Sequence, residues 1–97
     1  MTLYDKRRNK LINDLKDKKY RDAYVEESVR VGIPFQIRTI RNGKKLKQEE
    51  LGKLAGMKQE AICRLEDPNY GSFTLKTLNN IAAAFDVGLI VRFAPFS

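Results

Sequence analysis

Apolar side chains recur at helical spacing along most of this 97-residue chain, and the pattern predicts a series of helices. The first is expected over residues 2–16, with Thr2 as its N-cap, and a second over about residues 18–31. Their stripes comprise Leu3, Tyr4, Leu11, Ile12 and Leu15 in the first, and Tyr20, Ala23, Tyr24, Glu27 and Val31 in the second. The sequence Gly32-Ile33-Pro34 should then break or kink the path, because proline lacks an amide hydrogen and disfavours helical geometry in the residue before it.

Pro34 is suited to the first turn of a new helix, which Asn42-Gly43 should end. This helix carries Phe35, Ile37 and Ile40 together with Arg38 and Arg41. A loop of turn-forming residues is expected at positions 67–71. A last helix follows over residues 74–86, capped by Thr74, and its inward face comprises Leu75, Leu78, Ile81, Ala82 and Phe85.

Residues 48–66 carry the most informative pattern, two short amphipathic helices joined by a tight turn. Gly56 supplies the backbone freedom that such a turn requires, and Gly52 lies where the two helices must approach each other. The inward positions are Leu51, Leu54 and Ala55 on the first helix, Met57 in the turn, and Ile62 and Leu65 on the second. The outward polar row of the second helix comprises Lys58, Gln59, Glu60 and Arg64. This arrangement is a helix-turn-helix, and such a polar row can reach the edges of DNA bases.

The last residues depart from the helical pattern. Residues 87–96 are rich in β-branched and aromatic side chains, and Leu89, Val91 and Phe93 alternate with their neighbours, which predicts one short strand. A lone strand leaves its backbone hydrogen-bonding groups open, and pairing with a second copy about a two-fold axis would satisfy both edges. These three residues are therefore candidate dimerisation residues. The alternative is an extended tail packed on the helices of its own chain, and Pro95 limits the length of any strand.

Together these elements predict a mainly α fold. A helix-turn-helix domain is expected at residues 34–87, after an N-terminal helical extension at residues 1–33 and before a short C-terminal β-strand at residues 88–97. A chain of 97 residues has room for one domain with a modest core.

The charge of the chain is strongly positive. It has 19 Lys and Arg residues against 12 Asp and Glu residues, a formal net charge of +7, and the excess lies before residue 67. Such a surface attracts polyanions, which include both nucleic acids and acidic membranes. No apolar run approaches the roughly 20 residues that span a bilayer, and the first residues lack the apolar core of a signal peptide. The protein is therefore expected in the cytoplasm, associated with the nucleoid and without a membrane partner.

The chain offers little for catalysis. It contains no His and one Cys, so neither a triad with a His base nor a zinc cluster can form. No nucleophile with a matching base is visible, and the sequence predicts neither an enzyme nor a cofactor. Cys63 lies on the second helix of the motif, where it is either a redox-sensitive thiol at the DNA surface or a small half-buried side chain.

Residues 34–87 resemble the repressor and Cro-like helix-turn-helix domain of bacterial and phage regulators, the XRE family. The matching positions are Gln48, Leu51, Gly56, Gln59, Ile62, Leu65 and Glu66, followed by the segment TLKTLNNIAAAFDV. More weakly, residues 15–29 and 86–96 resemble extensions of regulators related to antitoxins of the host-inhibition type. The resemblance implies a DNA-binding domain whose second motif helix enters the major groove.

The resemblance also implies roles for single residues. Gln59 would bind adenine and Arg64 guanine, while Glu60 would accept from cytosine or steer Arg64. Gln48 would touch a phosphate and support Gln59. The phosphate candidates are Gln48, Lys47, Arg41, Lys44, Tyr70, Ser72 and Lys76, for which solvated surface side chains are the alternative interpretation.

Two positions depart from the family pattern. Most members have Ser or Thr at the N-caps of both motif helices, whereas this chain has Lys47 and Lys58. A lysine cannot accept the free amide hydrogens and adds positive charge to the positive end of the helix dipole, so each cap should cost about 1 kcal/mol of stability. Either the two ammonium groups face DNA phosphates, or the domain tolerates weak caps.

These observations leave three hypotheses for function. The first is a transcriptional regulator of the repressor type. It binds a palindromic operator in double-stranded DNA as a homodimer. The second is an antitoxin whose residues 1–32 neutralise a toxin protein while its DNA binding regulates its own operon. The third is a protein-interaction module that retains the fold without affinity for DNA.

Overall fold

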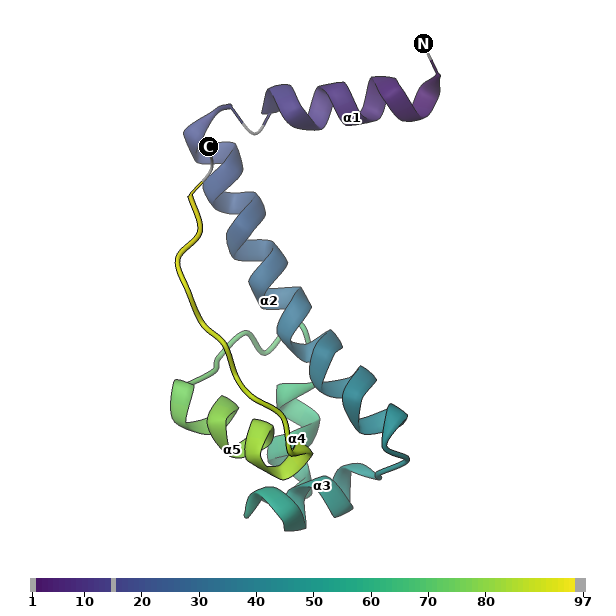
Figure 1. The fold of residues 1–97 in the computed structure, drawn as a ribbon, viewed down its shortest axis with the longest axis vertical. Coiled ribbons are helices and arrows are strands. Elements are labelled where there is room, and N and C mark those ends of the chain that lie inside the picture. The colour runs from purple at the N-terminus through teal and green to yellow at the C-terminus, as the bar shows by residue number, and fades with distance from the viewer. Residues whose placement is uncertain (1, 15, 96–97) are drawn as a thin grey trace.

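The computed structural model describes residues 2–14 and 16–95, which form five helices and no strand (Figure 1). In chain order these are α1 (Leu3–Asp14), α2 (Lys18–Gly43), α3 (Gln48–Ala55), α4 (Gln59–Leu65) and α5 (Leu75–Phe85). The mainly α prediction is confirmed. Leu15 and Phe96, which the sequence analysis assigned to the first helix and to the strand, lie outside the described residues.

The long helix α2 runs through the position where the sequence predicted a break. Asp17 caps its start by accepting a hydrogen bond from the backbone N–H of Tyr20 at 3.0 Å, and the helix continues past Pro34 to Gly43. Pro34 cannot donate to the carbonyl of Arg30 one turn earlier, yet its ring is fully buried. The burial of that ring offsets the missing hydrogen bond, so the prediction of a separate helix beginning at Pro34 is wrong.

The hydrophobic core lies where α3, α4 and α5 gather around the C-terminal half of α2 (Figure 1). Its buried side chains are Ile37, Leu51, Ile62, Leu65, Ile81 and Phe85. Met57 is partly buried against this cluster, as predicted. Leu54 and Leu75 are not part of it, because 59% and 61% of their surfaces are exposed. Their inward placement was wrong.

The turn between α3 and α4 has the predicted backbone. Gly56 lies in the left-handed region at φ 68°, and it ends α3. A Cβ at Gly52 would lie 2.6 Å from the carbonyl oxygen of Met57, so only glycine fits this approach. These two glycines fix the position of α4 relative to α3.

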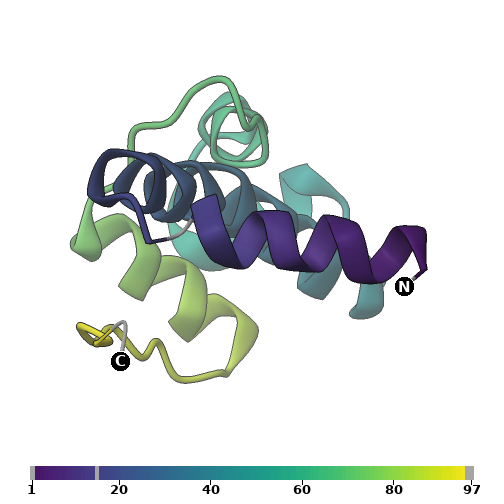
Figure 2. The same ribbon diagram turned by 90° about the horizontal axis from the view of Figure 1, so that it is seen from above.

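The N-terminal part of the molecule projects from this core. α1 projects sideways from the N-terminal end of α2 at one end of the molecule (Figures 1 and 2), whose extents are 50 × 27 × 23 Å. Of the described residues in the predicted apolar stripe of α1, Leu3, Tyr4 and Ile12 are exposed and Leu11 is half-buried. The N-terminal extension therefore has little apolar core of its own.

The C-terminal residues form an extended tail that returns along α2 (Figure 1). Leu89 is half-buried beside α2 and α5, while Val91 and Phe93 are exposed. Residues 92–95 lie beside Asp22, Val25 and Glu26 on the first turns of α2. The predicted strand is not formed in the described residues of the single chain, because no second segment offers its backbone for pairing.

Candidate nucleic-acid interface

Helix α4 separates an apolar inner face from a polar outer face. Ile62 is fully buried and Leu65 nearly so, and both are locked in the core. The polar row predicted from the sequence is exposed: Lys58, Gln59, Glu60 and Arg64. The burial of one face therefore fixes the direction in which the other face points.

Two shallow hollows border the outer face of α4, and Arg64 lines both of them. One, of about 500 Å³, is lined by Met57, Lys58, Glu60, Ala61 and Arg64. The other, of about 190 Å³, is lined by Met57, Ala61, Arg64, Leu65, Tyr70, Ser72, Thr74 and Thr77. The structure thus brings Tyr70 and Ser72, which follow α4 in the chain, next to the predicted base-reading arginine. Gln59 lines neither hollow.

Lys47 and Lys58 occupy the N-cap positions of α3 and α4, as predicted. Neither side chain makes a capping hydrogen bond. In α3 the Glu50 carboxylate partly compensates, because its Oε1 accepts from the backbone N–H of Lys47 at 3.0 Å. The ammonium groups of both lysines are left available to solvent or to a bound anion.

Arg41 belongs to the interior rather than to the surface. Its Nε donates to Glu66 Oε2 at 2.6 Å, Nη2 to Glu66 Oε1 at 2.8 Å, and Nη1 to the carbonyl of Leu46 at 2.8 Å. The hydrogen bonds to Glu66 raise the pKa of Arg41 above its ordinary value. Only 12% of the Arg41 side chain is exposed, so this residue ties α2 to the end of α4 and is unsuited to the phosphate contact predicted for it.

The amide of Gln48 is directed at the same carboxylate. Its Nε2 lies 3.4 Å from Glu66 Oε1, and the side chain is half-buried. Glu66 therefore joins α2, α3 and α4 through three side chains. The contact with Gln59 that the family resemblance implies for Gln48 stays a prediction.

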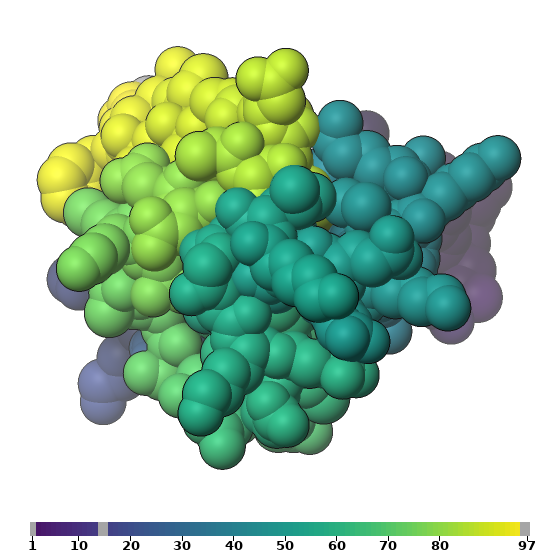
Figure 3. Space-filling model, turned by 90° about the horizontal axis from the view of Figure 1, so that it is seen from below, coloured from purple at the N-terminus to yellow at the C-terminus, as the bar shows by residue number. Residues whose placement is uncertain are grey.

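The other predicted residues lie on the surface. Lys44, at the end of α2, and Lys76, in the first turn of α5, are exposed. Figure 3 views the end of the molecule formed by α3, where the last turns of α2 and the helices α3 and α5 meet. Cys63 is exposed on α4, so its interpretation as a half-buried side chain is wrong. Glu60 was expected either to accept from cytosine or to steer Arg64. Among the described residues, 2–14 and 16–95, the two side chains form no ion pair with each other.

The structural role of Glu66 was not predicted from the sequence, nor was the place of Ala61 and Thr77 in the hollows beside α4. Glu66 follows Ile62 and Leu65 at helical spacing, which places it on the inward face of α4. A carboxylate at an inward position requires a cationic partner, and this was the available signal. Thr77 lies one turn into α5, and nothing in its local sequence indicates that it approaches α4.

Comparison with protein-family models, with curated proteins and with solved structures gave no match. Within the described ranges, no cluster of His, Cys, Asp and Glu side chains could hold a metal ion. None of the helices in that part of the chain is both long and apolar enough to cross a membrane.

Proposed function

We propose that the protein is a sequence-specific DNA-binding regulator of the repressor type, which binds a palindromic operator as a homodimer. The observation that carries the proposal is the exposed polar row of α4, held outward by the burial of Ile62 and Leu65. In this repressor-like arrangement α4 enters the major groove. There Gln59 binds adenine, Arg64 binds guanine, and Lys58 and Glu60 complete the base-reading row.

Side chains around α4 are suited to positioning the domain on the DNA backbone. Lys47 and Lys58 each place an ammonium group at a helix N-terminus that the lysine side chain does not cap, where backbone amides favour an anion. Tyr70 and Ser72 lie beside Arg64 and supply hydroxyl donors. Lys44 and Lys76 are more distant phosphate candidates. Arg41 is poorly suited to this set because its guanidinium is buried against Glu66, whereas the half-buried Gln48 remains a phosphate candidate.

A homodimer follows from the small size of the interface. One short recognition helix contacts few base pairs, whereas two copies about a two-fold axis contact two half-sites roughly 34 Å apart. The net charge of +7 provides the attraction to the backbone that does not depend on sequence.

A second candidate function is that of an antitoxin. The observation in its favour is the uncovered apolar side chains of α1, among them Leu3 and Tyr4. Such side chains are suited to a protein partner that would cover them. DNA binding would then serve regulation of the same operon.

Selection of bound fragments from a random DNA pool tests the proposal. We expect enrichment of a palindrome with half-site centres about one helical turn apart, and affinity that falls steeply with added salt. Binding without sequence preference would contradict base reading. Absence of salt-dependent retention on DNA would instead favour a protein-interaction module.

A further inference from the structure

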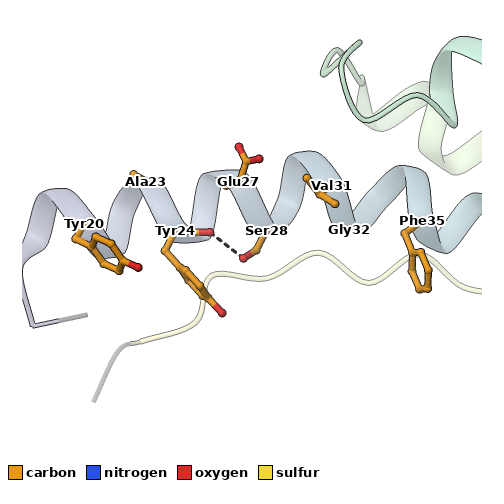
Figure 4. A pocket seen from close by; sticks show the side chains of 8 residues that line it. All are labelled: Tyr20, Ala23, Tyr24, Glu27, Ser28, Val31, Gly32 and Phe35. Carbon is orange, nitrogen blue, oxygen red and sulfur yellow. Dashed lines mark hydrogen bonds between the residues drawn. The ribbon is translucent and has the colours of Figure 1, made fainter. Parts of the chain in front are cut away.

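An apolar stripe along residues 20–35 of α2 is left uncovered by the rest of the chain. Its large side chains are Tyr20, Tyr24, Val31 and Phe35, which are 42 to 63% exposed. The Tyr20 and Tyr24 rings are stacked, with centroids 6.5 Å apart, and these rings and that of Phe35 project from one side of the helix (Figure 4). They line an open hollow of about 780 Å³ together with Ala23, Glu27, Ser28 and Gly32. We refer to these eight residues as the α2 stripe.

The α2 stripe is separate from the surface that α2 presents to the tail and to α5. The tail packs beside another set of α2 residues, namely Asp22, Val25, Glu26, Ile33, Gln36, Ile37 and Ile40. No residue of the stripe belongs to this set. At 3.6 residues per turn, the two sets fall on roughly opposite sides of the helix. The tail of the same chain therefore does not cover the stripe.

The α2 stripe has the same pattern when it is followed from either end. Tyr20 and Phe35, Tyr24 and Val31, and Ala23 and Gly32 lie at equal distances from a centre between Glu27 and Ser28. Two antiparallel copies related by a two-fold axis at this centre bring a ring of one copy level with a large apolar side chain of the other. We propose that the α2 stripe is the homodimer interface, with a second copy of this chain as its occupant.

Charged residues beyond the two ends of the α2 stripe are also placed symmetrically about its centre. Asp17 and Arg38 are also equidistant from the centre, so Asp17 of one copy is level with the partner's Arg38, and this pairing occurs twice. The Asp17 Oδ1 atom accepts from the backbone of Tyr20, which leaves Oδ2 for such a pair. Glu27 near the axis is already bound by Arg30 of its own chain, so the centre of the interface carries no unpaired charge.

The proposed pairing also separates the two cores. The helical core begins at Ile37, which at 1.5 Å per residue lies about 14 Å from the centre along α2, on opposite sides in the two copies. The cores are then at least about 28 Å apart, a distance of the order of the 34 Å between half-sites. This proposal rests on the proposed function only in assuming a homodimer. The role of the α2 stripe as the interface can be tested without DNA.

Site-specific crosslinking tests the register of the pairing. In a Cys63→Ser background, Ser28→Cys lies beside the two-fold axis and should be linked to its own copy by a short bismaleimide. Tyr20→Cys alone and Phe35→Cys alone should not be linked, because equivalent positions lie about 22 Å apart along the helix. A mixture of these two variants should give a linked heterodimer. Linkage of Tyr20→Cys to itself, or no linkage of Ser28→Cys, would contradict the antiparallel register.

Sedimentation at tens of micromolar tests the surface itself. The wild-type chain should be a dimer and Tyr24→Glu a monomer, because charge is placed in an apolar contact, while the helical circular dichroism signal is retained. The matched control is Phe93→Glu, which places the same charge on the exposed tail and should remain a dimer. A monomeric wild-type chain, or a dimer that Phe93→Glu disrupts and Tyr24→Glu does not, would overturn the proposal. If Tyr24→Glu remains dimeric yet loses a different protein partner, the stripe belongs to that partner.

Discussion

Helix α2 connects the N-terminal region of the molecule with the region that contains the core. An arginine–glutamate pair in each region shows how the burial of the same residue types differs between them. In the helix-turn-helix region, Arg41 and Glu66 are 12% and 5% exposed and join segments 25 residues apart. In the N-terminal half of α2, Arg30 and Glu27 are 37% and 59% exposed and lie one turn apart on the same helix. A buried pair links elements of the fold, whereas an exposed pair on one helix adds little.

Apolar side chains differ between the regions in the same way. Those near α4 close a core, but Leu3, Tyr4, Tyr24 and Phe35 remain on the surface. The difference indicates that the core region is stabilised within one chain. The N-terminal region instead leaves apolar surface exposed, which is the surface that a partner is proposed to cover.

The largest difference in the free energy of unfolding is expected between alanine substitutions of the two glutamates. Glu66→Ala leaves Arg41 buried without its carboxylate and should lower the free energy of unfolding by about 3–5 kcal/mol. Glu27→Ala should leave that free energy nearly unchanged, because the pair is exposed and Arg30 keeps its hydrogen bond to the carbonyl of Pro68. Urea denaturation of the two variants measures the difference. Similar losses in both would show that burial does not distinguish the pairs.

Two leucines provide the corresponding test for packing. Leu51→Ala creates a cavity at a fully buried position and should cost about 2–5 kcal/mol. Leu3→Ala, in the exposed stripe of α1, should change stability by no more than about 0.5 kcal/mol. Thermal melts followed by circular dichroism provide the measurement. A large loss in Leu3→Ala would mean that α1 packs on the rest of the chain.

Much of the core region could be predicted from the sequence because its signals are local. Gly56 marks the turn, Thr74 caps α5 by accepting from the backbone N–H of Thr77, and Lys47 and Lys58 stand at the predicted caps. Apolar spacing then placed Ile62 and Leu65 correctly. Each of these features depends on residues within one or two turns of the helix.

Three features that the sequence did not predict depend on distant parts of the chain. The continuity of α2 depends on the burial of Pro34, and the role of Arg41 depends on a carboxylate 25 residues away. The tail has the composition of a strand, but a strand needs a second segment with which to pair. The spacing of residues along one segment does not show which distant residues will pack against it or pair with it.

A smaller effect is expected at the two lysine caps. Lys47→Ser and Lys58→Ser should each stabilise the free protein by up to about 1 kcal/mol, because a hydroxyl can accept the free amide hydrogens. If the lysines bind phosphates, each substitution should also weaken DNA binding and reduce the salt slope by about one unit. Melts combined with titrations at several salt concentrations separate the two effects. Greater stability with an unchanged salt slope would show that the lysines are weak caps without a DNA contact.

The most direct test of base reading compares two exposed arginines, Arg64 on α4 and Arg8 on α1. Affinities are measured for the selected operator, for operators altered at single positions and for unrelated DNA. Arg64→Ala should remove roughly 1–3 kcal/mol of discrimination at one position and leave binding to unrelated DNA nearly intact, whereas Arg8→Ala should preserve discrimination at every position. If Arg64→Ala instead weakens binding to all sequences equally, or has no effect, α4 does not read the bases and the central claim is contradicted.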